Sequence, residues 1–244
     1  MNRKISAQLW SVRDYIDKDY LGTLKAIAEM GYTGVEFAGY GDFSAKEMKK
    51  ILDDLGLEGI SAHIGTDKLE GNLEAEIEYL NTIGAKFIVC PSGPVMDVES
   101  AKATAEKFTK IGEKCFQGGL TLAYHNHDYE FILNNGKVPL EVFFENVDGR
   151  YVKQQPDVYW VAYAGVDVKD YMTKHAARCP IIHLKQLENM DSKDNVNAGE
   201  GIIDFKFIAD VAPLAELVYE QEHYKDTSMA EMKSSLEAIR KAGI

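Results

Sequence analysis

Short apolar runs alternate with longer amphipathic segments along the whole chain. Each run has the length of a strand and is rich in β-branched and aromatic residues, which suit a pleated, largely buried backbone. Eight such runs are found, at 5–12, 33–39, 59–65, 86–93, 121–127, 157–161, 180–186 and 217–223. The distance between successive runs leaves room for one helix and its connections, so the pattern predicts repeated strand–helix units.

The segments between the runs place apolar residues at helical spacing and stop at glycine. The clearest one begins after Ser44, a residue suited to cap a helix N-terminus, and stops at Gly56. Glycine adopts the left-handed conformation that ends many helices at no steric cost. Similar segments stop at Gly31, at Gly84, at Gly118 and Gly119, and at Gly243. The helical pattern is weaker after the fifth to seventh runs, where a turn at 199–201 is expected to lead into a helix at 202–212.

Strict alternation of strands and helices predicts a parallel α/β sheet, because each helix must return the chain to the same end of the sheet. Eight units in 244 residues are what a closed (β/α)8 barrel, the TIM-barrel fold, requires. A doubly wound open sheet is the alternative, but it would normally carry a glycine-rich phosphate turn after the first strand. The segment at 11–20 has no such turn. No linker or low-complexity stretch interrupts the pattern, which predicts a single domain over 1–244.

The composition narrows the range of partners. The formal net charge of −12 disfavours DNA or an anionic membrane as a partner, because both would be repelled. We see no signal peptide and no apolar stretch near the roughly 20 residues that a membrane span needs. The chain has three widely spaced cysteines, namely Cys90, Cys115 and Cys179. They form neither a zinc pattern nor a disulfide framework, so we expect a reducing, cytoplasmic location.

Polar and ionisable residues gather at the carboxyl ends of the predicted strands, where a parallel barrel forms its active site. Four of the six histidines lie there. The stretch TLAYHNH even ends in two histidines on the same strand face. In chain order the strand-end residues are Gln8, Glu36, His63, His125, His127, Asp157, His183, Lys185 and Glu220.

A single histidine at a strand end is usually a hydrogen-bonded structural residue. Four potential ligands on neighbouring strands, His125, Asp157, His183 and Glu220, instead favour one bound divalent metal ion. Imidazole nitrogen with carboxylate oxygen suits Mn²⁺, Zn²⁺, Fe²⁺ or Co²⁺, whereas Mg²⁺ is less favoured by histidine ligands.

Four further residues are candidates for contact with a substrate: Gln8, Glu36, His63 and Trp160. Three of them have a structural alternative. Glu36 can cap a loop, His63 can hold a hydrogen bond, and Trp160 can pack in the core. Cys90 is expected to be buried filler, since nothing in the sequence places a base beside it.

With these residues in place, the chain resembles the sugar phosphate isomerase/epimerase family with the xylose isomerase-like barrel. The resemblance covers essentially the whole chain and rests on ISAQLWSVRD, GYTGVEFAGY, SAHIG, LAYHNHDYEF, DVYWVAYAGVD, IIHLKQ, GEGIIDF and YEQEHY. It implies a metal held by Glu, Asp, His and Glu from strands five to eight. The last three map onto Asp157, His183 and Glu220.

The chain departs from the family pattern at three positions. His125 stands where many relatives have the first glutamate, so the first ligand is His125 itself, His127 or Glu130. Gln186 replaces an acid in the seventh-strand motif. Pro156 precedes Asp157, and because proline cannot donate to a sheet ladder, the sixth strand is expected to break or shift there.

The resemblance implies a carbohydrate substrate and a proton transfer next to a metal-polarised carbonyl. Returning the proton to the neighbouring carbon is isomerisation, returning it to the opposite face of the same carbon is epimerisation, and loss of a β-hydroxyl is dehydration. Glu220 is the candidate base as well as a ligand, with His125 or His127 opposite. Lys185 is the candidate acid or oxygen-binding cation.

Other functions remain open at this point. An inosose dehydratase-like enzyme or a keto-sugar lyase or hydratase is the main enzymatic alternative. The superfamily also contains endonucleases of abasic DNA, which the negative charge disfavours. A sugar-binding barrel without turnover is a third possibility. No phosphate-binding loop is evident, and a homodimer is expected only because small barrels often pair.

Overall fold

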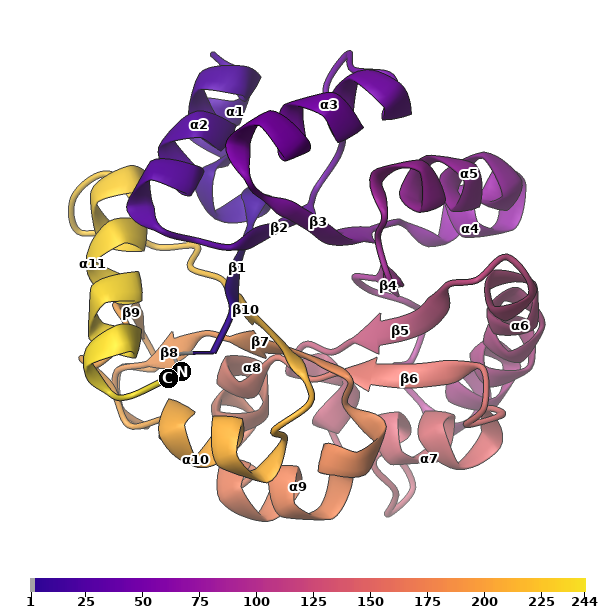
Figure 1. The fold of residues 1–244 in the computed structure, drawn as a ribbon. Coiled ribbons are helices and arrows are strands. Elements are labelled where there is room, and N and C mark those ends of the chain that lie inside the picture. Colours follow the sequence, from indigo (N-terminus) through magenta and orange to yellow (C-terminus); the bar gives the residue numbers. More distant parts are fainter. Residues whose placement is uncertain (1–2) are drawn as a thin grey trace.

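Eight parallel strands surround the centre of the molecule, and helices form a ring outside them (Figure 1). The structure is a computed structural model and describes residues 3–244. In their order around the sheet the strands are β6 (Val152–Gln155), β5 (Thr121–His125), β4 (Phe87–Cys90), β3 (Glu58–His63), β2 (Gly34–Phe37), β1 (Ile5–Gln8), β10 (Glu216–Tyr219) and β7 (Ile181–Leu184). The predicted barrel is therefore confirmed.

The barrel closes at two places. The two ends of the chain meet where β1 pairs with β10, with Ala7 opposite Tyr219. The other seam joins β6 to β7 and is almost open, because it consists of a single parallel bridge between Asp157 and His183. There the backbone N–H of His183 donates to the carbonyl of Pro156 at 2.9 Å.

The predicted sixth strand at 157–161 is wrong. Strand β6 lies earlier, at Val152–Gln155, and 157–161 belongs mostly to helix α8 (Val158–Tyr163). Pro156 ends the strand because it has no backbone N–H for the sheet. Asp157 then caps α8, since its Oδ1 accepts the Tyr159 N–H at 2.9 Å. Asp157 still lies at the carboxyl end of the sixth strand.

Four helices end directly before glycines that the sequence indicates, namely Gly31, Gly56, Gly84 and Gly118, whereas the helix expected at 202–212 is confined to Phe205–Val211. Ser44 and Glu47 form a reciprocal capping box at the start of α3, and Gly56 ends that helix with a φ of 67°. The α-helices are α1 (Arg13–Ile16), α2 (Tyr20–Met30), α3 (Ala45–Leu55), α4 (Thr66–Gly71), α5 (Leu73–Ile83), α6 (Val98–Gln117), α7 (Pro139–Asn146), α8, α9 (Val168–His175), α10 (Phe205–Val211) and α11 (Ser228–Lys241).

Shorter elements complete the fold. They are the 3-10 turns η1 (Leu9–Val12), η2 (Tyr129–Phe131) and η3 (Ala176–Arg178), and the hairpin of β8 (Gln186–Leu187) and β9 (Asn195–Val196). Among residues 3–244, no helix has both the length and the hydrophobicity needed to cross a lipid bilayer.

The barrel interior changes from apolar to polar toward the carboxyl ends of the strands. A small apolar cluster, separate from the large core between strands and helices, consists of Ile60, Phe87, Val89, Ala123, Ile181 and Val218. Side chains two residues apart share a strand face. The residues that follow Ala123, Ile181 and Val218 at this spacing are His125, His183 and Glu220. The strand period therefore places the ionisable residues directly above an apolar floor.

Gly201 allows the turn before α10 to pass close to β8. A Cβ atom at this position would lie 2.0 Å from the Leu187 carbonyl oxygen and 2.7 Å from Gln186 Oε1. Gln186, which replaces the acid of the family motif, is buried and bonds to both the N–H and the C=O of Ile203. Gln186 thus anchors this turn.

We predict that Gly201→Ala lowers the free energy of unfolding by about 1–3 kcal/mol, because the backbone must move to relieve the overlap. Gly71→Ala is the matched control, since a Cβ there meets nothing within 4 Å. Urea unfolding of both variants checks this. Equal stability of the two variants would show that the turn adjusts freely.

Candidate active site at the barrel mouth

Four ionisable side chains converge at the carboxyl ends of neighbouring strands. His125, Asp157, His183 and Glu220 each offer one ligand atom, and these atoms all lie within 4.8 Å of one another. They come from the end of β5, the residue after Pro156, the middle of β7 and the residue after β10. All four are buried. We call this set the four-ligand cluster.

Asp157 carries the strongest sign that a cation belongs here. Its Oδ2 is buried and has no hydrogen-bond partner within residues 3–244, although it lies 3.8 Å from Lys185 Nζ. Burial, opposed by Lys185 and reinforced by Glu220, raises the pKa of Asp157 to about 7. A carboxylate in this position lacks the donors that buried charges normally have. Two imidazoles and two carboxylates fit a divalent transition-metal ion.

His183 lies between two carboxylates. Its Nε2 is 2.5 Å from Glu36 Oε1, and its Nδ1 is 3.2 Å from Glu220 Oε2. Burial alone would lower the pKa of His183, but the two neighbouring carboxylates raise it to about 10. Burial also acts to raise the pKa of Glu220, yet Lys185 and His183 hold it well below its ordinary value.

Lys185 supplies the positive charge of the site. Its Nζ lies 2.8 Å from Glu222 Oε2 and 3.6 Å from Glu220 Oε2. The rings of Trp160 and Tyr159 cover it, with centroids at 4.9 and 5.1 Å. Burial acts to lower the pKa of Lys185, but the surrounding carboxylates hold it above its ordinary value. The side chain is therefore an ammonium at neutral pH.

His127 lies beside the cluster with a free ring nitrogen. Its ring centroid is 5.1 Å from that of His125, and its Nδ1 is buried without a hydrogen-bond partner in the described part of the chain. Burial, reinforced by Lys185, lowers the pKa of His127. The imidazole is thus neutral at pH 7 and able to accept a proton.

A cavity of about 260 Å³ opens above the cluster. Its lining residues are Trp10, Ala38, His63, Pro91, His125, His127, Glu220 and Glu222. Trp10 is absent from the sequence-based candidates. This residue is 47% exposed, and the Arg13 guanidinium lies 4.9 Å from its ring centroid. Its backbone N–H donates to Gln8 Oε1. Trp10 lies inside the first apolar run at 5–12, and no feature of the sequence marks it as a cavity residue.

The four residues predicted to contact substrate lie at different distances from the cavity. His63 lines the cavity. Trp160 lies behind His127, with ring centroids 5.4 Å apart, and is expected to act through that histidine. Gln8 and Glu36 are fully buried and bonded to each other at 2.7 Å. They lie outside the cavity lining, and their polar atoms are bonded to protein groups.

Glu130, an alternative first ligand, has both oxygens engaged elsewhere. Oε1 accepts from the Tyr124 hydroxyl at 3.0 Å, and Oε2 accepts from the backbone N–H of His127 at 2.7 Å. It supports the loop after β5 rather than the cluster. Cys90 at the end of β4 is buried, and burial raises the pKa of its thiol to about 12, which leaves it a poor nucleophile.

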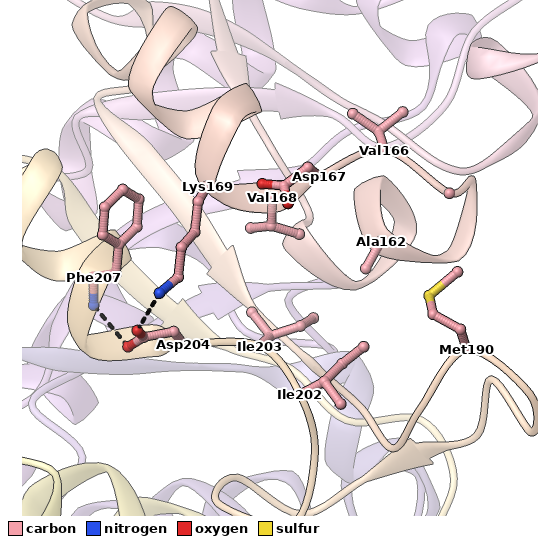
Figure 2. A pocket seen from close by; sticks show the side chains of 11 residues that line it. Ala162, Val166, Asp167, Val168, Lys169, Met190, Ile202, Ile203, Asp204 and Phe207 are labelled. Carbon is pink, nitrogen blue, oxygen red and sulfur yellow. Dashed lines mark hydrogen bonds and ion pairs between the residues drawn. The ribbon is translucent and has the colours of Figure 1, made fainter.

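A second concavity lies between α8, α9 and the segment before α10 (Figure 2). Its walls are mostly apolar, and Lys169 and Asp204 pair across one end at 2.9 Å. Asp204 and Asp167 also accept backbone N–H groups at the starts of α10 and α9. Because its charged groups are already paired, this concavity lacks the converging free groups found at the mouth.

Comparison with known proteins agrees with the fold. The family model "Xylose isomerase-like TIM barrel" matches residues 24–242. An inosose dehydratase from Clostridium perfringens is 25% identical over 205 residues, which cover 73% of this chain and 68% of that protein.

Solved structures agree as well. A sugar phosphate isomerase/epimerase from Parabacteroides distasonis superposes with a TM-score of 0.81 at 24% identity, over 98% of this chain and 94% of that one. A 3-keto-D-glucoside 4-epimerase from E. coli gives 0.73 at 17% identity, over 98% and 99% of the two chains. At these identities the structural matches support the fold alone.

The buried Glu130 predicts a pH-dependent stability. Burial raises the pKa of its carboxyl from 4.5 to about 7, so the protonated form is favoured in the folded protein. Its contribution to stability is complete below pH 4.5 and is lost as the pH rises through 7. Compared with Glu130→Gln, the wild type should lose about 2–3 kcal/mol over this interval. Urea unfolding at several pH values measures it, with Glu78→Gln on the exposed face of α5 as control. A constant difference between wild type and Glu130→Gln would refute the assignment.

Proposed function

The chain belongs to the xylose isomerase-like TIM barrel family, and from this premise we propose that it is a metal-dependent sugar isomerase or epimerase. The observation that carries the proposal is the four-ligand cluster below an open cavity, with the buried and unpartnered Asp157 Oδ2 inside it. The substrate is a small carbohydrate that bears a carbonyl next to a hydroxyl-bearing carbon.

The proposed ligands are His125, Asp157, His183 and Glu220. A divalent ion bound by them would polarise the substrate oxygens and make the adjacent C–H more acidic. The two imidazoles favour Zn²⁺, Co²⁺ or Mn²⁺ over Mg²⁺. Lys185 helps to hold Glu220 ionised, which keeps that carboxylate available both as a ligand and as a base.

Proton transfer is assigned to groups that line the cavity or lie beside it. His127 is neutral and offers its unpartnered Nδ1 as an acceptor. Glu220 is the second acceptor. Lys185, held as an ammonium, donates a hydrogen bond or a proton to a substrate oxygen. The wall residues Trp10 and His63 would contact the sugar ring.

Dehydration is the second candidate. The curated relative from Clostridium perfringens is an inosose dehydratase, and the ammonium of Lys185 close to Glu220 is a suitable acid for a leaving hydroxyl. The same first step, removal of a proton beside a carbonyl, serves both reactions. A sugar-binding barrel without turnover would bind the same ligand without exchanging its protons.

Metal analysis is the first test. We expect about one transition-metal ion per chain in the wild type and a large loss in Asp157→Asn and Glu220→Gln, because each removes a charged ligand. Asp167→Asn is a matched control, since Asp157 and Asp167 both cap a helix through a side-chain oxygen. Wild-type protein that binds no Zn²⁺, Co²⁺ or Mn²⁺ after reconstitution would overturn the metal-dependent mechanism.

Solvent exchange is the second test. The metal-loaded wild type should incorporate deuterium from D₂O into a keto sugar. His127→Asn should slow exchange of the proton that His127 removes by roughly 10²–10⁴-fold while still binding metal. His175→Asn, in α9, is the control histidine. If His127→Asn exchanged protons at the wild-type rate, another residue would be the base. If a tightly bound sugar exchanged no protons in the wild type, the protein would be a binder.

A further inference from the structure

One buried carboxylate, Glu36, joins most of the histidines of the site. Its Oε1 accepts from His183 Nε2 at 2.5 Å and from Gln8 Nε2 at 2.7 Å, and His63 Nε2 lies 3.1 Å away. Its Oε2 accepts from Ser61 Oγ at 2.6 Å and from Gln155 Nε2 at 2.7 Å. An ionised carboxylate can only accept hydrogen bonds. Every group that faces Glu36 must therefore present a proton.

This requirement fixes the orientation of the Gln155 amide. The NH₂ group faces Glu36, so the carbonyl Oε1 must face the other way. There it lies 3.0 Å from His125 Nδ1 and 2.9 Å from His63 Nε2. Since an amide oxygen only accepts, both of these ring nitrogens must carry hydrogens. His125 therefore keeps its proton on Nδ1 and leaves Nε2 free.

His183 is held in the opposite tautomer to His125. Its Nε2 faces Glu36 Oε1 directly, so that nitrogen carries the hydrogen, while Nδ1 faces Glu220 within the four-ligand cluster. A histidine ligand is commonly held in this way, by a carboxylate that takes the N–H of the nitrogen remote from the metal.

We propose that Glu36, directly and through Gln155, sets the two histidine ligands in opposite tautomers, so that His183 binds the metal through Nδ1 and His125 binds it through Nε2. This inference rests on the proposed function, because it assigns atoms to the same metal. Glu36 and Gln155 are positioning residues. Glu36 also supplies a third negative charge close to a cluster that has only two carboxylates.

The same contacts decide what a second group of histidines does. His63, His125 and His183 also lie within ligand distance of one another. On this inner side, however, His63 Nε2, His125 Nδ1 and His183 Nε2 are all donors to Gln155 or Glu36. They cannot offer lone pairs to a second ion while this network is intact.

Nitrogen NMR of the zinc-loaded protein tests the tautomers directly. In protein labelled with ¹⁵N-histidine and loaded with Zn²⁺ alone, His183 should show a protonated Nε2 and a metal-bound Nδ1, and His125 should show the reverse. Binding of both histidines through the same nitrogen would overturn the inference while leaving the metal site intact. Failure to bind Zn²⁺, Co²⁺ or Mn²⁺ would instead overturn the proposed function.

Two variants test the roles of the positioning residues. Gln155→Leu removes the acceptor for His125 but not the Glu36–His183 bond, so of the two histidine ligands only His125 should lose its single tautomer. Glu36→Gln affects both histidines, because its NH₂ group would face donors and drive the Gln155 amide to flip. Zinc affinity, measured against a chromophoric chelator, should fall by about 10–100-fold in Glu36→Gln.

Glu76→Gln is the matched control, since Glu76 is also a buried glutamate. It lies in α5, outside the cluster and the cavity lining, and accepts a hydrogen bond from the Tyr40 hydroxyl. It should retain wild-type zinc affinity. Unchanged affinity and unchanged tautomers in both Glu36→Gln and Gln155→Leu would show that the network only fills the barrel. A variant that fails to fold leaves the wild-type spectrum as the deciding measurement.

Discussion

A fully buried carboxylate dominates the interior of this barrel. Burying a charge is costly unless donors surround it, and the ion-pair partners of Glu36 among residues 3–244 are histidines rather than lysine or arginine. Burial acts to raise the pKa of Glu36, yet His63 and His183 hold it well below its ordinary value. The donors come from β1, β3, β6 and β7. The Glu36 carboxylate therefore links side chains from these four strands by hydrogen bonds and restricts the orientation of each.

The weak seam of the barrel lies next to the same site. Pro156 stops β6 and leaves only one bridge to β7, between Asp157 and His183. Two neighbouring members of the four-ligand cluster thus lie where the sheet is least complete. Asp157 uses one oxygen to cap α8, and the other is buried without a hydrogen-bond partner among residues 3–244. A bound cation would add a link across the seam, so metal binding and barrel closure are expected to reinforce each other.

Much of the fold could be predicted because it follows local periodicity. Helix ends coincide with glycines, and the step of two residues from Ala123 to His125 or from Val218 to Glu220 places ionisable groups at the strand ends. Strand β6 could not be found in this way. Its sequence VKQQ is largely polar, yet Gln154 and Gln155 are buried. Their partners Tyr171 and Glu36 are 17 and 119 residues away, which no local pattern reveals.

In the candidate site, too, single residues could be predicted from local sequence, but their contacts with distant residues could not. Strand-end residues could be recognised individually, but a polar residue at a strand end looks the same in the sequence whether it faces a cavity or a neighbouring strand. Gln8 and Glu36, which the sequence predicts as substrate contacts, are buried and bond to each other, and Glu36 also bonds to His183. Trp10 was missed because nothing in its own neighbourhood separates an exposed aromatic at the cavity wall from ordinary surface.

The histidine at position 125 limits the chemistry that the proposed site can perform. On the proposed assignment, one of its nitrogens donates to Gln155 and the other binds the metal, so His125 has no lone pair left for a substrate proton. A glutamate ligand keeps a second oxygen that can act as a base. Transfer on the strand-five side must then pass to His127, whose Nδ1 is unpartnered.

The assignment of metal binding to His125 and of proton transfer to His127 affects which reaction the site can perform. Epimerisation needs an acceptor and a donor on opposite faces of one carbon, and here these would be Glu220 and His127, one of them also bound to the metal. Dehydration needs one base and one acid, for which either acceptor combined with the buried ammonium of Lys185 suffices. The departure from the family pattern at position 125 therefore leaves epimerisation dependent on His127, whereas dehydration can proceed through Glu220 and Lys185 without it. Loss of His127 thus separates the two reactions more sharply than loss of any metal ligand, because every ligand is shared by both.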